Sequence, residues 1–209
     1  MKKFLFIFLI FFAITLQIAA AESEHDVSVG MQFTKGWGGT SSRKFDSSNK
    51  DKLDPEAFGL VVENHNAMWG DFGFMEKVAL EFIPGSYSDD SIGFYLMAGP
   101  AYQIRPRNHT KFQFAAGLQM DYLKGENHSF SSKTTMNIFH MGLAAEARVK
   151  FTAHKKSSPV VGLAFGFDPI VKGEHGYEYE KNTSYNWKAD IKGPIVTFTM
   201  FGQFCFNIK

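Results

Sequence analysis

Residues 111–122 read KFQFAAGLQMDY, a stretch in which every second side chain is apolar. Phe112, Phe114 and Leu118 share one phase of this alternation, and Gln113 and Gln119 share the other. Because successive side chains leave a pleated strand on opposite faces, a period of two predicts a β-strand. The strand has one apolar face and one polar face.

Seven further segments repeat this alternation. Their ranges are 26–34, 56–65, 72–82, 91–103, 135–151, 159–168 and 195–208. A chain built from such strands, with no helical period between them, is typical of an all-β fold with antiparallel neighbours. Eight strands are enough to close a barrel, which leaves no exposed sheet edge. We therefore predict a closed eight-stranded antiparallel up-and-down β-barrel.

The first 21 residues have the pattern of a signal peptide. Lys2 and Lys3 precede an apolar run over 4–18, and the small residues of 19–21 suit a signal peptidase. The run is short for a membrane-spanning helix. We expect 1–21 to be removed, which leaves 22–209 as one barrel domain.

The composition excludes several function classes. The 22 basic and 21 acidic residues give a net charge of +1, so no charge excess favours nucleic acid. The single cysteine, Cys205, cannot form an internal disulfide, and we expect it to be a small buried residue. Charged residues make up 21% of the chain, more than a helical membrane protein would carry. A membrane barrel needs only half of each strand to be apolar.

Alternation alone leaves open which face of the barrel is apolar. A soluble lipocalin-like barrel places the apolar face inside, around a ligand. Many small residues share the polar phase here, which suits the crowded interior of a narrow barrel. These are Gly59, Gly73, Gly93, Gly99, Gly117, Gly142, Gly162 and Gly166. Aromatic residues also recur at both ends of the apolar stripes, as at membrane interfaces. We predict a transmembrane barrel and keep the soluble ligand-binding barrel as an alternative.

Glu76 is the one charged residue in the apolar phase. A β-bulge near Phe74 and Met75 would shift the register and turn it inward. Alternatively, Glu76 lies at the periplasmic rim, where an acidic side chain costs little. We prefer the rim.

The connections alternate between long and short. The two longest are 35–55 and 169–194, and the second contains alternating residues that predict a hairpin extending the barrel. Outer-membrane barrels have long loops outside and short periplasmic turns. We therefore expect both termini to be periplasmic.

The polar phase predicts a lumen filled by side chains. In a barrel of this size the interior is just wide enough for side chains, and buried charges need partners. We expect a structural network of salt bridges and hydrogen bonds rather than an open pore. Its members are Glu63, Lys77, Glu81, Lys111, Asp121, His140, Glu146, Arg148, Lys150, Asp168 and Gln203.

No residue pattern predicts a metal, a cofactor or a catalytic site. We place His65, His109 and His154 in short turns, where histidines are usually solvated, and so predict no metal site. An outer-rim hydrolase or acyltransferase would need His128 or His175 with nearby acids such as Asp89 and Asp90, and serines. Since no spacing singles out such a set, we predict a non-enzymatic protein and keep the enzyme as an alternative.

The mature chain resembles small eight-stranded outer-membrane barrels of the OmpW and OmpX type. MKKFLFIFLIFF (1–12), DVSVGMQFTKGWGG (26–39) and FGFMEKVALEF (72–82) are similar to an uncharacterised family of treponemal outer-membrane proteins. The resemblance implies the outer membrane of a Gram-negative-type (diderm) bacterium and contact with its lipid. It also implies a surface-exposed structural or interaction protein, or a narrow transporter of small apolar molecules. Small apolar solutes or extracellular ligands would engage 35–55 and 169–194.

Overall fold

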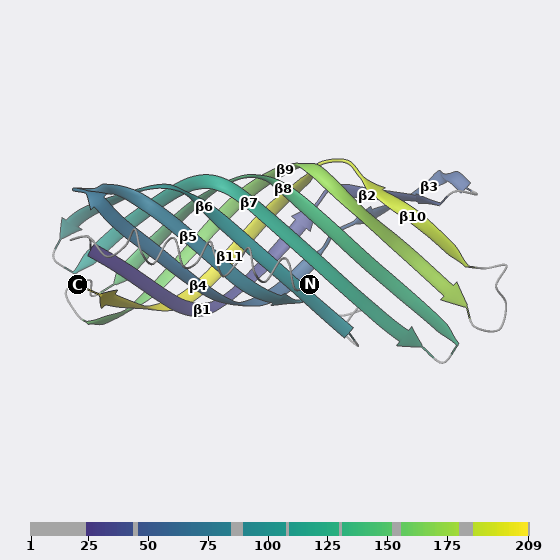
Figure 1. Ribbon diagram of the computed structural model, residues 1–209, viewed down its shortest axis with the longest axis horizontal. Helices are drawn as coiled ribbons and strands as arrows, with labels where there is room; N and C mark the ends of the chain where they lie inside the picture. Colours follow the sequence, from purple (N-terminus) through teal and green to yellow (C-terminus); the bar gives the residue numbers. More distant parts are fainter. Residues whose placement is uncertain are drawn as a thin grey trace.

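Eleven β-strands make up nearly all of the part of the chain that the computed structural model describes, which is 24–43, 46–84, 90–107, 109–129, 131–151, 156–179 and 186–208 (Figure 1). The strands are β1 (Glu24–Trp37), β2 (Gly39–Arg43), β3 (Asp46–Leu53), β4 (Glu56–Trp69), β5 (Phe72–Phe82), β6 (Asp90–Arg107), β7 (Thr110–Ser129), β8 (Ser132–Phe151), β9 (Ser157–Tyr179), β10 (Trp187–Lys192) and β11 (Ile195–Ile208). Among these residues, no helix is long and apolar enough to cross a membrane. The predicted signal peptide, 1–21, lies outside the described residues.

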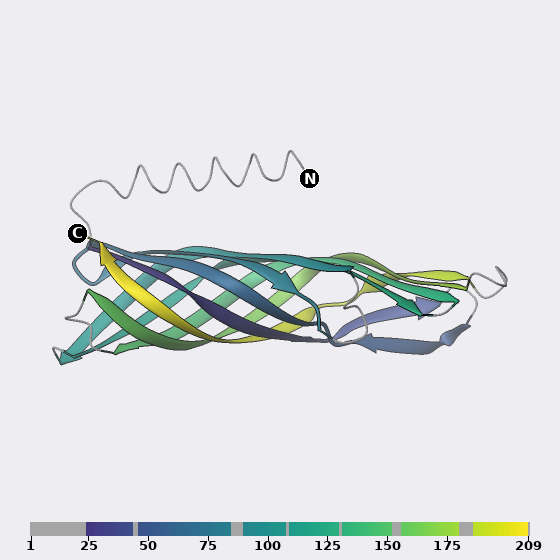
Figure 2. The same ribbon diagram turned by 90° about the horizontal axis from the view of Figure 1, so that it is seen from below.

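Eight of the strands close into a ring. Their order is β11-β1-β4-β5-β6-β7-β8-β9, and pairing of β9 with β11 completes the circle. Every neighbouring pair is antiparallel. The tilted strands wrap around the long axis of the molecule (Figures 1 and 2). The predicted closed eight-stranded antiparallel barrel is confirmed.

The outward face of the ring is apolar and the inward face is polar. Met31, Phe165 and Phe204 are 60–63% exposed on the outside, whereas Glu63 and Lys77 are fully buried inside. So large an apolar exterior is stable in lipid and would aggregate in water. The barrel is therefore a transmembrane barrel, and the lipocalin-like alternative, with its apolar interior, is wrong.

Glu76 keeps its place on the outward face. It pairs in regular register with Asn64 of β4 and Ala98 of β6, and the irregularity between β4 and β5 lies elsewhere, between Ala67 and Trp69. The bulge explanation is therefore wrong. Glu76 lies five residues after Asp71, in the short turn between β4 and β5, which agrees with the rim explanation.

The barrel sheet continues beyond the ring as an extension built from the long connections. β9 runs on to Tyr179 and pairs with β10, β10 pairs with β2, and β2 pairs with β3. The extension lies at the end of the barrel opposite the start of β1 and the end of β11 (Figure 2). The hairpin predicted in 169–194 is confirmed, but the expectation of a loop over 35–55 is wrong. That segment is polar and has weak strand propensity, yet β2 pairs with β3 over most of its length and with β10 at Thr40 and Ser41, which satisfies backbone groups of the segment.

Two glycines mark the passage from barrel to extension. Gly38, between β1 and β2, has φ of 112°, and Gly193, between β10 and β11, has φ of 96°. Such positive φ values favour glycine over every other residue. A Cβ atom on Gly38 would also lie 2.7 Å from the carbonyl oxygen of Pro194. The chain therefore bends at Gly38, between β1 and β2, and at Gly193, between β10 and β11. Both bends lie where the barrel passes into the extension.

Candidate functional site in the barrel lumen

The lumen is filled by polar side chains that meet across the barrel. All eleven residues expected in the lumen are at most 4% exposed. They fall into two groups. The inner cluster, at the end of the barrel where β1 begins and β11 ends, contains Asp26, Glu63, His65, Lys77, Lys111, Gln113, Glu146, Arg148, Lys150 and Gln203. The outer cluster, at the end near the extension, contains Gln32, Thr34, Glu81, Gln119, Asp121, His140, Asp168 and Thr197.

Asp26 joins opposite walls of the barrel. It lies on β1, and its carboxylate accepts hydrogen bonds from Lys111 Nζ at 2.9 Å, Lys150 Nζ at 2.5 Å and Gln113 Nε2 at 3.0 Å. β1 and β7, which carries Lys111, lie opposite each other in the ring. These bonds therefore cross the lumen rather than follow its wall.

Glu63 makes a second bridge across the lumen. Its Oε1 lies 2.6 Å from Arg148 NH1, and β4 and β8 are also opposite each other in the ring. Lys77 Nζ lies 3.1 Å from Glu63 Oε2 and also donates to Glu146. Four basic and three acidic side chains thus neutralise one another to within one charge. This balance is what the burial of charged groups requires.

The outer cluster is rich in carboxylates. Asp168 accepts hydrogen bonds from Gln119 Nε2 at 2.9 Å and contacts His140 Nδ1 at 2.8 Å. The other imidazole nitrogen, Nε2, lies 3.3 Å from Asp121 Oδ2. Glu81 accepts from Gln32 Nε2 at 2.8 Å. An imidazole between two carboxylates donates to both only when it is protonated.

An apolar layer closes the lumen above the outer cluster. Ile83 and Leu123 lie two residues after a member of that cluster and Ile138 two residues before one. Each therefore lies nearer to the extension than that member. The layer consists of Ala57, Ile83, Leu123, Met136, Ile138, Ile191 and Ile195, with Val171 packed against it. Its side chains come from both the barrel and the extension, so the extension caps the barrel.

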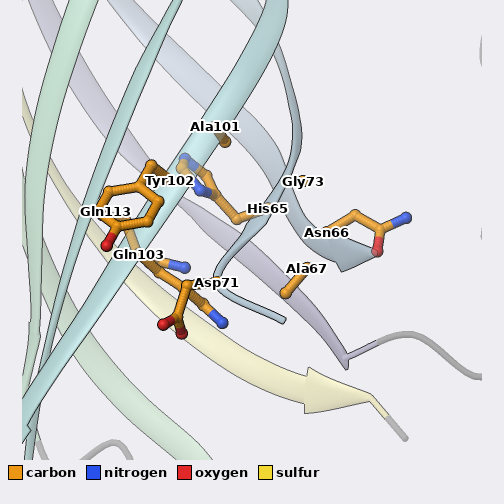
Figure 3. A pocket seen from close by; sticks show the side chains of 9 residues that line it. All are labelled: His65, Asn66, Ala67, Asp71, Gly73, Ala101, Tyr102, Gln103 and Gln113. Atoms are coloured by element: carbon orange, nitrogen blue, oxygen red, sulfur yellow. The ribbon is translucent and has the colours of Figure 1, made fainter. Parts of the chain in front are cut away.

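Two small recesses lie at opposite ends of the lumen. The first is lined by His65, Asn66, Ala67, Asp71, Gly73, Ala101, Tyr102, Gln103 and Gln113 (Figure 3). The second lies beside Asp121 and His140. The inner cluster separates them.

One group of side chains has the spacing of a metal site. Ligand atoms of Glu63, His65 and Glu146 lie within 4.8 Å of one another, and all three residues are buried. Lys77 and Arg148, however, already neutralise the two carboxylates. A divalent ion would add two uncompensated positive charges to a dry interior. The group is therefore better described as part of the salt-bridge network.

The prediction of a solvated His65 in a turn is wrong. β4 continues to Trp69, so alternation turns His65 inward, where it is 4% exposed and lies 3.3 Å from Glu63. His109 does lie in an exposed turn, and His154 is outside the described residues. Alternation past residue 65 could have identified this lumen residue.

His128 and His175, the two histidines considered for an outer-rim enzyme, lie on opposite faces of the sheet. His128 points outward beside Glu126, whose Oε2 lies 2.7 Å from Lys133 Nζ. That hydrogen bond holds the pKa of Glu126 below its ordinary value. His175 lies on the opposite, inward face of the extension, in line with Gly173. Asp89 is outside the described residues.

Asp26, Gln32 and Thr34 are lumen residues that sequence reasoning missed. All three are on β1 and at most 4% exposed. They share a phase with one another and alternate with the outward-facing Val27, Val29 and Phe33. The alternation that identified the other lumen residues was therefore sufficient to find them.

Replacement of His140 by Phe is expected to lower the free energy of unfolding by about 1–3 kcal/mol. The change leaves the buried carboxylates of Asp121 and Asp168 without their shared imidazole donor. Urea unfolding of the barrel in lipid vesicles measures the effect. His109→Gln, in an exposed turn, should change stability by no more than about 0.5 kcal/mol. Equal losses in the two variants would contradict the role given to His140.

No protein-family model and no curated protein sequence matches the chain. Among solved structures, the chain is similar to Neisserial surface protein A, with a TM-score of 0.56 and 11% identity over 88% of this chain and 97% of that one. It is also similar to the outer membrane protein OprG from Pseudomonas aeruginosa, with a TM-score of 0.53 and 15% identity over 87% and 95% of the two chains. The narrower likeness to treponemal proteins stays a prediction. The fold of this chain is that of the small eight-stranded outer-membrane β-barrels.

Proposed function

We propose that the protein is a non-enzymatic outer-membrane barrel of a diderm bacterium that presents its extension at the cell surface to extracellular ligands. The observation that carries this proposal is the closed lumen. Asp26 with Lys111, and Glu63 with Arg148, connect opposite walls through fully desolvated ion pairs. Opening a path would require these charges to separate in a dry interior, which costs several kcal/mol per ion.

The described wall of the barrel does not favour transport of small apolar molecules sideways into the membrane. Such passage needs a break between neighbouring strands. β11 pairs without interruption with β1, from Val196 to Ile208, and with β9, from Ile195 to Phe206. The pairing of β6 with β7 is interrupted only at Gly99 and Pro100 and beside the turn that joins these strands, and that of β8 with β9 only between Met141 and Leu143. An interaction role therefore agrees better with this geometry than the transport role.

The two ends of the barrel differ in a way that supports the proposed orientation. At the end with Glu24 and Ile208, β4 and β5 are joined by a turn of only Gly70 and Asp71. At the other end the sheet extends through β2, β3 and β10. Outer-membrane barrels keep short turns in the periplasm and long segments outside. The termini are then periplasmic, as in the sequence-based expectation.

Cysteine labelling of intact cells tests this orientation. The native Cys205 is fully buried, so the unmodified protein should not react with a membrane-impermeant maleimide. Lys188→Cys, exposed on β10, should be labelled in intact cells. Asp71→Cys, exposed at the opposite end, should be labelled only after the outer membrane is permeabilised. The reverse pattern would contradict the orientation. If neither variant were labelled, even in permeabilised cells, the exposure of both sites would be contradicted.

A further inference from the structure

Two lysines lie side by side where the apolar exterior of the barrel ends. On β9 the outward apolar stripe runs to Ile170, which is 44% exposed, and the next outward residue is Lys172. Gly173 pairs with Ile191 of β10. Lys172 precedes Gly173 and Lys192 follows Ile191. Because the strands are antiparallel, both lysines lie one residue nearer to the barrel than this pair and are neighbours across the two strands.

Both lysines point away from the lumen. The adjacent residues, Val171 and Ile191, belong to the apolar layer that closes the barrel, so alternation turns Lys172 and Lys192 outward. Both are exposed. Among the residues that the structure describes, no carboxylate lies within 4.0 Å of either ammonium group. Like charges on directly opposite residues of neighbouring strands destabilise a sheet. The pair therefore favours an anion bound from outside the protein.

The surroundings of the pair indicate the side from which that anion comes. Lys172 is paired across the strands with Phe139 of β8, and on its own strand Ile170 lies toward the barrel. Both residues belong to the lipid-facing stripe. Away from the barrel, the next outward residues are Glu174 and Asp190, which pair with each other. An anion approaching through solvent passes these carboxylates, whereas a lipid phosphate approaches from the apolar side. Lysines at such a border extend along apolar surface and place the ammonium group at headgroup level.

We propose that Lys172 and Lys192 together bind the phosphate of an anionic lipid headgroup in the leaflet around the extension end of the barrel. The lysine pair would fix a lipid at the junction of β9 and β10, where the barrel passes into the extension. This inference depends on the barrel standing in a membrane and does not depend on the ligand of the extension.

Native mass spectrometry of the detergent-purified protein with added phosphatidylglycerol tests the site. The unmodified protein should retain phosphatidylglycerol in preference to diacylglycerol, which has no phosphate. Each single Lys→Gln change should weaken binding about fivefold, and Lys172→Gln with Lys192→Gln about 30-fold. Replacement of both lysines by Arg should preserve binding, because the charge remains.

Lys188→Gln is the matched control. Lys188 is exposed on the same strand and the same face as Lys192 but lies beyond Asp190, so its loss should leave phosphatidylglycerol binding unchanged. The shift in gel mobility on heating should show that every variant is folded. Undiminished binding by the double Gln variant would overturn the proposal, as would an equal loss in Lys188→Gln. Inorganic phosphate binding as tightly as the lipid, with the same dependence on both lysines, would also overturn it, because the site would then take a free anion.

Discussion

Arg148→Met is expected to lower the free energy of unfolding by about 3–5 kcal/mol. Arg148 is among the largest fully buried side chains, and Met has a similar apolar volume, so loss of charge dominates the change. The guanidinium contacts Glu63 and also donates to Gln113 and Ser28. Without it, Lys77 remains as the shared cation of Glu63 and Glu146, so the group of Glu63, Lys77, Glu146 and residue 148 changes from neutral to one negative charge in excess.

Urea unfolding in phospholipid vesicles, followed by tryptophan fluorescence and by gel mobility, measures this loss. Arg105→Met is the matched control, since Arg105 is exposed on β6 and its replacement should cost no more than about 0.5 kcal/mol. Combining Arg148→Met with Glu63→Gln makes this local group neutral again and should cost less than Arg148→Met alone. A single variant no less stable than the control would show that the bridge does not stabilise the lumen.

Gly142→Ala is expected to cost about 1–3 kcal/mol, because the added methyl group has no room. A Cβ atom there would lie 1.9 Å from the carbonyl oxygen of Phe167 and 2.6 Å from Asp168 Cα. The pairing of β8 with β9 shifts register at this point, between Met141 and Leu143, which brings the backbone of β9 over Gly142. Since the obstacle is backbone, a rotamer change cannot relieve the clash.

The same unfolding measurement applies to Gly142→Ala. Gly202→Ala is its control, because no atom lies within 4 Å of the Cβ position at the outward-facing Gly202. The substitution at Gly142 also moves Asp168, which binds His140 and Gln119. Its effect should therefore be less than additive with that of His140→Phe. Strict additivity, or equal stability of the two alanine variants, would contradict the close packing of β8 on β9.

The eight barrel strands and their faces could be predicted from the sequence because alternation is a local signal. The phase of Phe112 and Phe114 identifies the lipid-facing side of β7 without knowledge of its neighbours. The polar residues of β2 and β3 carry no such phase, and these strands form by pairing with each other and, at Thr40 and Ser41, with β10. The predicted strand 56–65 also ends four residues before the end of β4 at Trp69, and for this reason His65 is predicted to lie in a turn.

The contacts within the lumen could not be predicted in the same way. Asp26 and Lys111 are 85 positions apart in the sequence, and their bond depends on the register between strands on opposite walls. Alternation shows that both side chains point inward, but it does not show how far each strand is displaced along its neighbours. The division into a balanced inner cluster and a carboxylate-rich outer cluster follows from that displacement.

Planar-bilayer recording of the purified protein tests the closure of the lumen most directly. A mock preparation, purified in the same way from cells that do not express the protein, controls for contaminating channels. With Asp26–Lys111 and Glu63–Arg148 bridging opposite walls, we predict no stepwise ion conductance from the folded, heat-modifiable barrel at neutral pH. Reproducible conductance steps from the unmodified protein, absent from the control preparation, would contradict a closed lumen.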